Sequence, residues 1–271
     1  MKQLIFFEDL GCNRSYKEIW DLQEIMLHEN VSLKSERSNG LVINHKQPFA
    51  NGKLETYNAQ LATDISHPST QNHLLFVEHN PVYTLGKSGD INHVLIEEKD
   101  REKKGIEFFK INRGGDITFH GPGQLVAYPI LDLEDFKTDL GWYLRNLEEV
   151  IILTMTEYGL TGDRSKGETG VWIDPGIKGR ERKICAMGIR CSRWITMHGF
   201  AFNINTDLAY FNYIIPCGIK NKQVTSLEKE LGYKIPMAEV KQKVKNNFGK
   251  VFNAKVIEVI GGELRARTHE P

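Results

Sequence analysis

The sequence predicts an α/β or α+β protein built around a β-sheet. Two observations predict this class. Short runs of β-branched, aromatic and aliphatic residues have the length of strands, and other stretches carry apolar residues at the spacing of amphipathic helices. The two kinds of segment interleave along 271 residues, a length that can bury a real core. Because no linker rich in Pro, Gly or Ser divides the chain, we expect a single domain over residues 1–271.

The first part of the chain predicts one strand, one helix and an insertion. Residues 1–9 indicate a strand, and the apolar spacing over Tyr16 to Glu29 predicts a helix. Residues 30–72 are polar and contain turn signals, so we expect an irregular surface insertion there. Within it, residues 41–43 and 54–57 are candidates for a short hairpin.

The middle of the chain predicts three strands. Residues 74–77 and 108–111 are short apolar runs, and residues 124–131 form a longer one that Pro129 interrupts. Since proline cannot donate a backbone hydrogen bond, we expect an edge or bulge position for this third strand.

The second half predicts two helices and a hairpin. Residues 140–158 place apolar side chains on one helical face, and Gly159 suits the residue after a helix end. Residues 183–190 and 194–205 indicate two strands joined over residues 191–193. Pro236 begins a last helix.

Composition excludes several classes of protein. Lys plus Arg and Asp plus Glu each number 35, which argues against a general nucleic-acid binder. No apolar run approaches the ~20 residues of a membrane span, and the start turns acidic too soon for a secretory signal. The default is therefore a cytoplasmic protein with reduced thiols. The histidines and cysteines show no metal-ligand spacing, so we expect no zinc site.

Three segments are candidates for chemistry. Residues 112–124 carry four glycines within ten residues, bracketed by Arg113 and His120, but lack the signatures of a P-loop or a dinucleotide fingerprint. Lys183 opens an apolar strand, inside a stretch from 178 to 193 with six basic residues and one acidic residue. This stretch is either a docking patch for an acidic carrier or a hydrated rim.

The third segment places Cys217 between Pro216 and Gly218, where glycine clears space beside a thiol. A structural loop, a solvated strand end and a buried thiol are the ordinary alternatives for the three segments. We expect Cys12, Cys185 and Cys191 to serve packing.

Taken together, six stretches resemble the lipoyl(octanoyl) transferase family, a branch of the biotin and lipoate protein ligase fold. They are residues 79–87, 113–129, 170–172, 183–190, 198–203 and 216–218, in the order of the family. The resemblance implies a central mixed, twisted β-sheet flanked by helices. The chain departs from the family in its long polar stretch at 30–72 and in the thiols at 185 and 191.

The resemblance also implies a reaction: an octanoyl group moves from octanoyl-acyl carrier protein to a lysine of a lipoyl domain, without a cofactor. The acceptors would be lipoyl domains of 2-oxoacid dehydrogenase complexes and the glycine cleavage H protein, and the enzyme would be a monomer. Cys217 falls at the family's acyl-thioester position and Lys183 at the position that lowers the thiol pKa. The residues that would surround the acyl chain are Arg113, Gly114, Gly115, Asp116, Ile117, Thr118, Phe119, His120, Ala186, Met187, Gly188, Gly199, Phe200 and Ala201.

Three other functions remain open. An ATP-dependent lipoate or biotin ligase would share the fold but would not use a nucleophilic cysteine. A protein that only binds lipoyl domains would form no acyl adduct. A cysteine hydrolase would need a histidine base, for which His120 and His198 are candidates.

Overall fold

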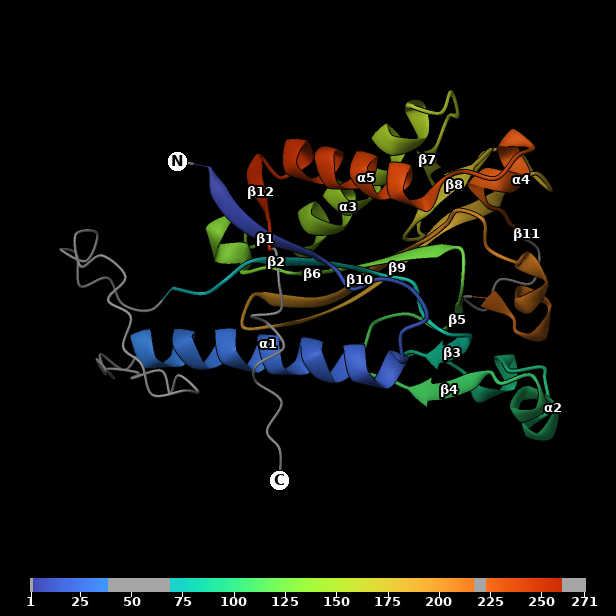
Figure 1. The fold of residues 1–271 in the computed structure, drawn as a ribbon, viewed down its shortest axis with the longest axis horizontal. Coiled ribbons are helices and arrows are strands. Elements are labelled where there is room, and N and C mark those ends of the chain that lie inside the picture. Colours follow the sequence, from blue (N-terminus) through green and yellow to red (C-terminus); the bar gives the residue numbers. More distant parts are fainter. Residues whose placement is uncertain (1, 39–68, 217–222, 260–271) are drawn as a thin grey trace.

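The computed structural model describes residues 2–38, 69–216 and 223–259, and within them the largest sheet is mixed (Figure 1). Its strand order is β12-β1-β2-β6-β10-β9-β8-β7, and β11 pairs with β9. Strand β1 runs parallel to β12 and β2. Each strand pairs antiparallel with the next in the order β2, β6, β10, β9, β8, β7. The predicted mixed sheet is confirmed. The bounds are β1 Gln3–Asp9, β2 His73–Val77, β6 Gln124–Ile130, β7 Asp163–Arg164, β8 Val171–Ile173, β9 Arg182–Ser192, β10 Ile195–Asn203, β11 Gln223–Val224 and β12 Ala254–Glu258.

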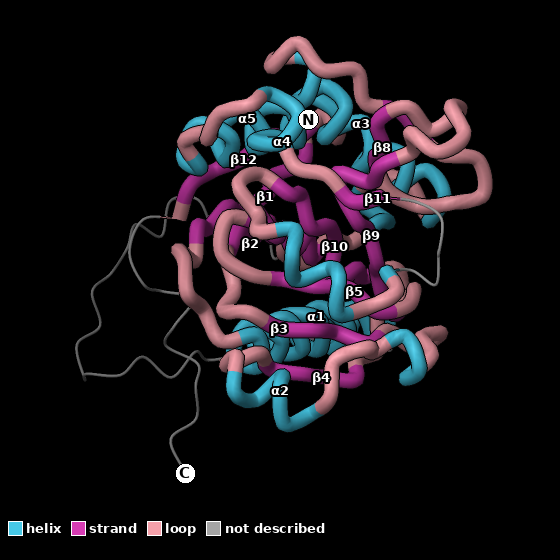
Figure 2. The backbone as a smooth tube through the Cα atoms, turned by 90° about the vertical axis from the view of Figure 1, so that its right-hand side faces the viewer, coloured by secondary structure: helices cyan, strands magenta, loops and turns pink. Residues whose placement is uncertain are grey.

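Helices cover both faces of this sheet. Helix α1 (Tyr16–Ser38) lies on one face, and α3 (Leu140–Thr156) and α5 (Met237–Val251) lie on the other (Figure 1). A second sheet, of order β4-β3-β5, lies on the α1 side with the short helix α2, as Figure 2 shows. The remaining bounds are β3 Val82–Leu85, β4 Glu107–Lys110, β5 Ile117–His120, α2 Glu98–Lys103, α4 Leu227–Leu231 and the 3₁₀ helices η1 Ile91–His93, η2 Leu133–Asp135 and η3 Leu208–Tyr213.

Helix α3 forms where its apolar periodicity predicts it. The Asp139 carboxylate caps its start by accepting a hydrogen bond from the Trp142 N–H at 2.9 Å. Tyr143, Leu147 and Ile151 are fully buried against the sheet, and each such side chain contributes about 1.5–3 kcal/mol of hydrophobic free energy. The helix ends before Gly159, which has φ +74°.

Helix α1 extends nine residues beyond the predicted Glu29, so the irregular region does not begin at residue 30. Tertiary contacts explain why polar residues continue the helix. Asn30 exchanges two hydrogen bonds of 2.9 Å with the backbone of Gln71, and Lys34 Nζ lies 2.8 Å from Asp132 Oδ1. The end of the predicted insertion is also part of the fold, since Thr70 and Asn72 are buried. The candidate hairpin at 41–43 and 54–57 lies outside the described residues.

Pro129 lies in a central strand, so the expected edge position is wrong. Strand β6 is buried throughout, between β2 and β10. Its pairing with β10 runs from Gln124 to Ala127 and resumes as an isolated bridge at Asp132. The proline therefore occupies a break in the ladder, where its missing N–H costs no strand hydrogen bond. The Thr196 hydroxyl donates to the Pro129 carbonyl at 2.9 Å across this break.

The predicted hairpin is confirmed as β9–β10, with a two-residue turn at 193–194 in place of the expected three-residue turn at 191–193. Arg193 and Trp194 both have positive φ, at 48° and 68°, as a two-residue hairpin turn requires. The exposed Cys12 contradicts its expected packing role, whereas Cys185 is buried and Cys191 is half-buried. Within the described part of the chain, no helix combines the length and apolarity needed to cross a membrane.

Candidate functional site

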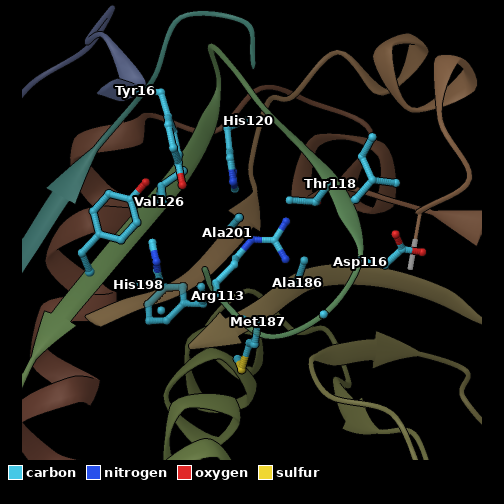
Figure 3. A pocket seen from close by; sticks show the side chains of 16 residues that line it. Tyr16, Arg113, Asp116, Thr118, His120, Val126, Ala186, Met187, His198 and Ala201 are labelled. Carbon is cyan, nitrogen blue, oxygen red and sulfur yellow. The ribbon is translucent and has the colours of Figure 1, made fainter. Parts of the chain in front are cut away.

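A pocket lies between the β9–β10 hairpin, strand β6, the start of α1 and the glycine-rich loop (Figure 3). Its empty volume is about 480 Å³, which includes open solvent at its mouth. Residues from elements far apart in the sequence line it. They are Tyr16, Arg113, Gly115, Asp116, Ile117, Thr118, His120, Val126, Tyr128, Ala186, Met187, Gly188, His198, Gly199, Phe200 and Ala201.

All residues predicted to surround an acyl chain line this pocket, except Gly114 and Phe119. The Gly114 N–H donates to the Ile189 carbonyl at 2.9 Å and so attaches the loop to β9. The Phe119 ring points into a separate apolar cluster, where it stacks on Tyr210 at a centroid distance of 4.5 Å. Both residues therefore shape the loop without facing the pocket.

Small residues lie opposite each other on the two hairpin strands. Gly188 pairs with Gly199, and Ala186 pairs with Ala201. A Cβ on Gly199 would lie 2.3 Å from the Ala127 carbonyl oxygen, and one on Gly188 would lie 2.8 Å from that of Gly114. Glycine is required at both positions because backbone atoms of neighbouring segments approach too closely for any side chain.

A backbone kink in β10 forms the end of the pocket farthest from Lys183. His198 has φ +58°, and its N–H donates to Gln23 Oε1 on α1 at 2.9 Å instead of to a neighbouring strand. Its ring Nε2 lies 3.1 Å from Asn112 Oδ1. The kink coincides with the break in β6–β10 ladder pairing, and Tyr128 and His198 both line the pocket beside this break.

Buried polar side chains form another wall. The Arg113 guanidinium donates to the Thr84 carbonyl at 2.8 Å and to its hydroxyl at 2.9 Å. The His120 ring stacks on Tyr16 at 5.9 Å with an interplanar angle of 6°. Burial lowers the pKa of His198 to about 3 and lowers the pKa of His120 well below its usual range. Both rings are therefore neutral near pH 7 and are weak bases.

Lys183 lies at the start of β9, three residues before Ala186. Its backbone pairs with Trp172 of β8 and Val224 of β11, and its carbonyl accepts from the Thr225 N–H at 2.9 Å. The ammonium Nζ lies 4.6 Å from the centroid of the Trp172 ring. Lys183 does not line the pocket itself, which begins farther along the same strand.

Cys217 lies outside the described residues, but the structure describes the chain on either side of its segment. Before it, Ile214 bridges to Val94, and the Ile215 N–H donates to the His93 carbonyl at 2.8 Å. After it, the described chain begins with β11, where Val224 pairs with Lys183.

Three of the six basic residues from 178 to 193, namely Arg180, Arg182 and Arg190, form ion pairs within the chain. Arg182 binds Glu230 at 2.6 Å and Asp174 at 2.7 Å, and Arg190 binds Glu24 at 2.8 Å. This finding weakens the interpretation of the stretch as a docking patch. Among the described residues, no group of three or more His, Cys, Asp or Glu side chains is arranged to hold a metal ion.

Sequence reasoning missed four pocket residues, namely Tyr16, Val126, Tyr128 and His198. His198 belongs to a stretch that resembles the family, yet only its possible role as a base was considered. Tyr16 begins a helix 97 residues before Arg113, and no local pattern reveals that its ring meets His120.

Comparison with known proteins identifies the family. The catalytic-domain model of lipoyl protein ligases A and B matches residues 47–249. An octanoyltransferase of Christiangramia forsetii is 53% identical over 257 residues, which cover 94% of this chain and 99% of the relative. One from Flavobacterium johnsoniae is 51% identical over 258 residues, which cover 95% and 100%.

The fold agrees with this assignment. A solved structure of a bi-partite lipoate protein ligase and its E2 lipoyl domain from Thermoplasma acidophilum matches with a TM-score of 0.62 at 15% identity, covering 97% of this chain and 89% of that one. A lipoate-protein ligase A bound with ATP matches with the same TM-score at 14% identity, covering 97% and 91%. The chain belongs to the lipoyl protein ligase A/B catalytic domain family.

Proposed function

We propose that this chain is an octanoyltransferase that acts through a thioester on Cys217. The donor is octanoyl-acyl carrier protein, and the acceptor is a lysine of a lipoyl domain. The observation that carries the proposal is the pocket of paired small residues that begins three residues beyond Lys183 on β9. The pocket lies beside these Gly and Ala pairs, and burial of an alkyl chain in it would contribute about 0.8 kcal/mol per CH₂. The octanoyltransferases that share half of its residues over nearly its whole length support the same reaction.

The reaction proceeds in two exchanges. The Cys217 thiolate attacks the donor carbonyl, a new C–S bond forms, and the carrier thiolate leaves and takes up a proton. The acceptor amine then attacks the Cys217 thioester, its C–N bond forms, and the Cys217 thiolate leaves. The amine proton passes to solvent or to a neutral Lys183. Because the donor is already a thioester, no ATP is consumed.

Lys183 has the charge that the first exchange needs. An unperturbed cysteine with a pKa of ~8.5 is only about 3% thiolate at pH 7. An ammonium within about 4–6 Å lowers such a pKa by about one to three units. We propose that Lys183 supplies this ammonium, so that no histidine base is needed; burial leaves His120 and His198 neutral near pH 7.

The alternatives fit less well. An ATP-dependent ligase is represented among structures of the same fold, but at 14% identity that likeness concerns the fold alone. A cysteine hydrolase would need a competent histidine base, and burial leaves both candidate rings weakly basic. We further propose that the chain is a single catalytic domain, a monomer, and works in the cytoplasm on 2-oxoacid dehydrogenase lipoyl domains and the glycine cleavage H protein.

Intact-mass spectrometry tests the mechanism directly. The protein is incubated with octanoyl-acyl carrier protein in the absence of ATP, and an octanoyl adduct is expected. Cys217→Ser should abolish the thioester adduct, whereas Cys12→Ser, which removes an exposed thiol, should leave it intact. Lys183→Arg keeps the charge but changes its geometry, so the adduct should form much more slowly. An adduct that requires ATP or persists in Cys217→Ser would refute the mechanism.

A further inference from the structure

We propose that Trp172 is a positioning residue for Lys183: its indole ring holds the ammonium in place. The proposal rests on the role given to Lys183 above. It concerns the residues of the β8 segment that lie against this lysine, to which the proposed reaction assigns no role. Three features of this segment carry the inference.

The first feature is the contact itself. Lys183 Nζ lies 4.6 Å from the Trp172 ring centroid, within the ~6 Å range of a cation–π interaction. Trp172 is 1% exposed, so its ring is held on all sides and presents one fixed face to the ammonium. The negative electrostatic face of an indole attracts a cation and offers little to a neutral amine.

The second feature is an irregularity that places the ring opposite the lysine. Val171 pairs with Cys185, but Trp172 pairs with Lys183, so the β8–β9 register shifts by one residue between Val171 and Trp172. Without the shift, Trp172 would lie opposite Ile184. Bulges of this kind re-aim a side chain, and here the re-aimed side chain is the indole.

The third feature is the support of the lysine stem. Gly170 has φ +117°, and a Cβ there would lie 2.5 Å from the Cys185 carbonyl oxygen and 3.6 Å from Lys183 Cε. The Gly170 N–H donates to Glu148 Oε1 at 3.0 Å. Glu148 is fully buried on α3, and its other oxygen binds Arg145 at 2.8 Å and Arg164 at 3.0 Å. An ion cluster thus fixes the chain at Gly170, immediately before the strand that carries Trp172.

A cation–π contact between a buried indole and a half-buried ammonium changes the balance between held and free ammonium by roughly 5- to 30-fold. A tryptophan that served packing alone would give a different result, because its replacement would change stability without changing the ionisation of a nearby thiol. The test therefore measures thiol ionisation rather than turnover.

The readout is the pH dependence of Cys217 alkylation by iodoacetamide, followed by peptide mass spectrometry. No acyl donor is present, and a Cys12→Ser background removes the exposed competing thiol. Lys183→Met should move the pH midpoint upward. Trp172→Leu should move it in the same direction and slow alkylation at pH 7 roughly 5- to 30-fold, while Trp172→Phe, which keeps an aromatic face, should fall between.

Two controls separate positioning from packing. Trp142→Leu removes a tryptophan that packs on Phe252 at 5.8 Å, and it should lower stability without moving the midpoint. If Trp172→Leu does not fold, fluorinated tryptophans placed at position 172 preserve the ring shape while weakening its negative face. The midpoint should then rise stepwise with the number of fluorine atoms.

The outcomes are distinct. A midpoint that moves in Lys183→Met but stays at the wild-type value in Trp172→Leu and in the fluorinated series would overturn the role of Trp172 and leave the proposed function standing. A midpoint that does not move in Lys183→Met would instead overturn the proposed role of Lys183 itself.

Discussion

Replacing Gly199 by alanine tests whether close backbone packing shapes the pocket. The added Cβ would lie 2.3 Å from the Ala127 carbonyl oxygen and 2.6 Å from Pro129 Cδ. An ordinary carbon–oxygen contact is about 3.3 Å or longer, so strands β6 and β10 must separate by about 1 Å. Both strands lie in the middle of the sheet and are buried, and the atoms in the way cannot rotate aside.

Overpacking of this kind costs about 1–3 kcal/mol, and we expect the upper end because backbone must move. For a chain of this size, a loss of about 3 kcal/mol lowers the Tm by roughly 6–12 °C. The same Cβ enters the pocket wall, so formation of the octanoyl adduct should also slow. Urea unfolding followed by circular dichroism measures the first effect, and intact mass measures the second.

Gly176→Ala is the matched control for this change. No heavy atom lies within 4 Å of the place that a Cβ would take at Gly176, and its φ is outside the left-handed region. Alanine there should be neutral or stabilising by about 0.4–1 kcal/mol, because it restricts the unfolded chain. Equal stability of Gly199→Ala and Gly176→Ala would refute the argument from close approach.

Three further predictions concern buried polar groups. Burial lowers the pKa of His73 and His79 to about 4, below the ordinary 6.5, so the unfolded chain binds protons first as the pH falls. The free energy of unfolding should therefore drop between about pH 6.5 and 4, by at most about 3 kcal/mol per ring. In urea titrations at several pH values, His73→Gln should flatten this dependence. Arg113→Lys loses the two-pronged contact with Thr84 and should destabilise the fold by about 1–3 kcal/mol and slow adduct formation; wild-type values for both would contradict it. Glu230→Gln weakens the charge-assisted hydrogen bonds of 2.6 and 2.7 Å to Arg182. The free energy of unfolding, measured by thermal unfolding, should fall by about 1–3 kcal/mol. An unchanged value would show that this ion pair does not stabilise the fold.

The sequence predicts those parts of the fold whose local pattern and tertiary role agree. The periodicity of α3 matches the face that the sheet buries, and the strands of the β9–β10 hairpin have the composition of half-buried strands. It does not predict β3, β5, β7, β8, β11 or β12, which are short or lie at edges and in small sheets. Two- to five-residue strands carry too little periodicity to be recognised before their partners are known.

Tertiary contacts override local signals at two places. Helix α1 continues through polar residues because Asn30 and Lys34 find partners at residues 71 and 132. Pro129 is tolerated in a central strand because the β10 ladder is interrupted beside it. Neither compensation is visible locally, since each partner lies more than 40 residues away in the sequence.

The two ends of the pocket also differ in whether the local sequence reveals them. Its near part, around Ala186, Gly188 and Ala201, comes from stretches whose glycines and small residues are apparent in the sequence. Its far end comes from Tyr16, Tyr128 and His198, on three elements that only the fold brings together. Small residues along the near part give any alkyl chain the same room, so they distinguish chain lengths poorly.

We propose that discrimination between chain lengths depends instead on the far end, which the rings of Tyr128 and His198 line. There, one methylene more or less is worth only about 1–3 kcal/mol. The His198 kink, which Gln23 stabilises from α1, sets the position of that end. On this proposal helix α1 contributes to selection of the acyl group through Gln23, although it bears none of the residues proposed to react.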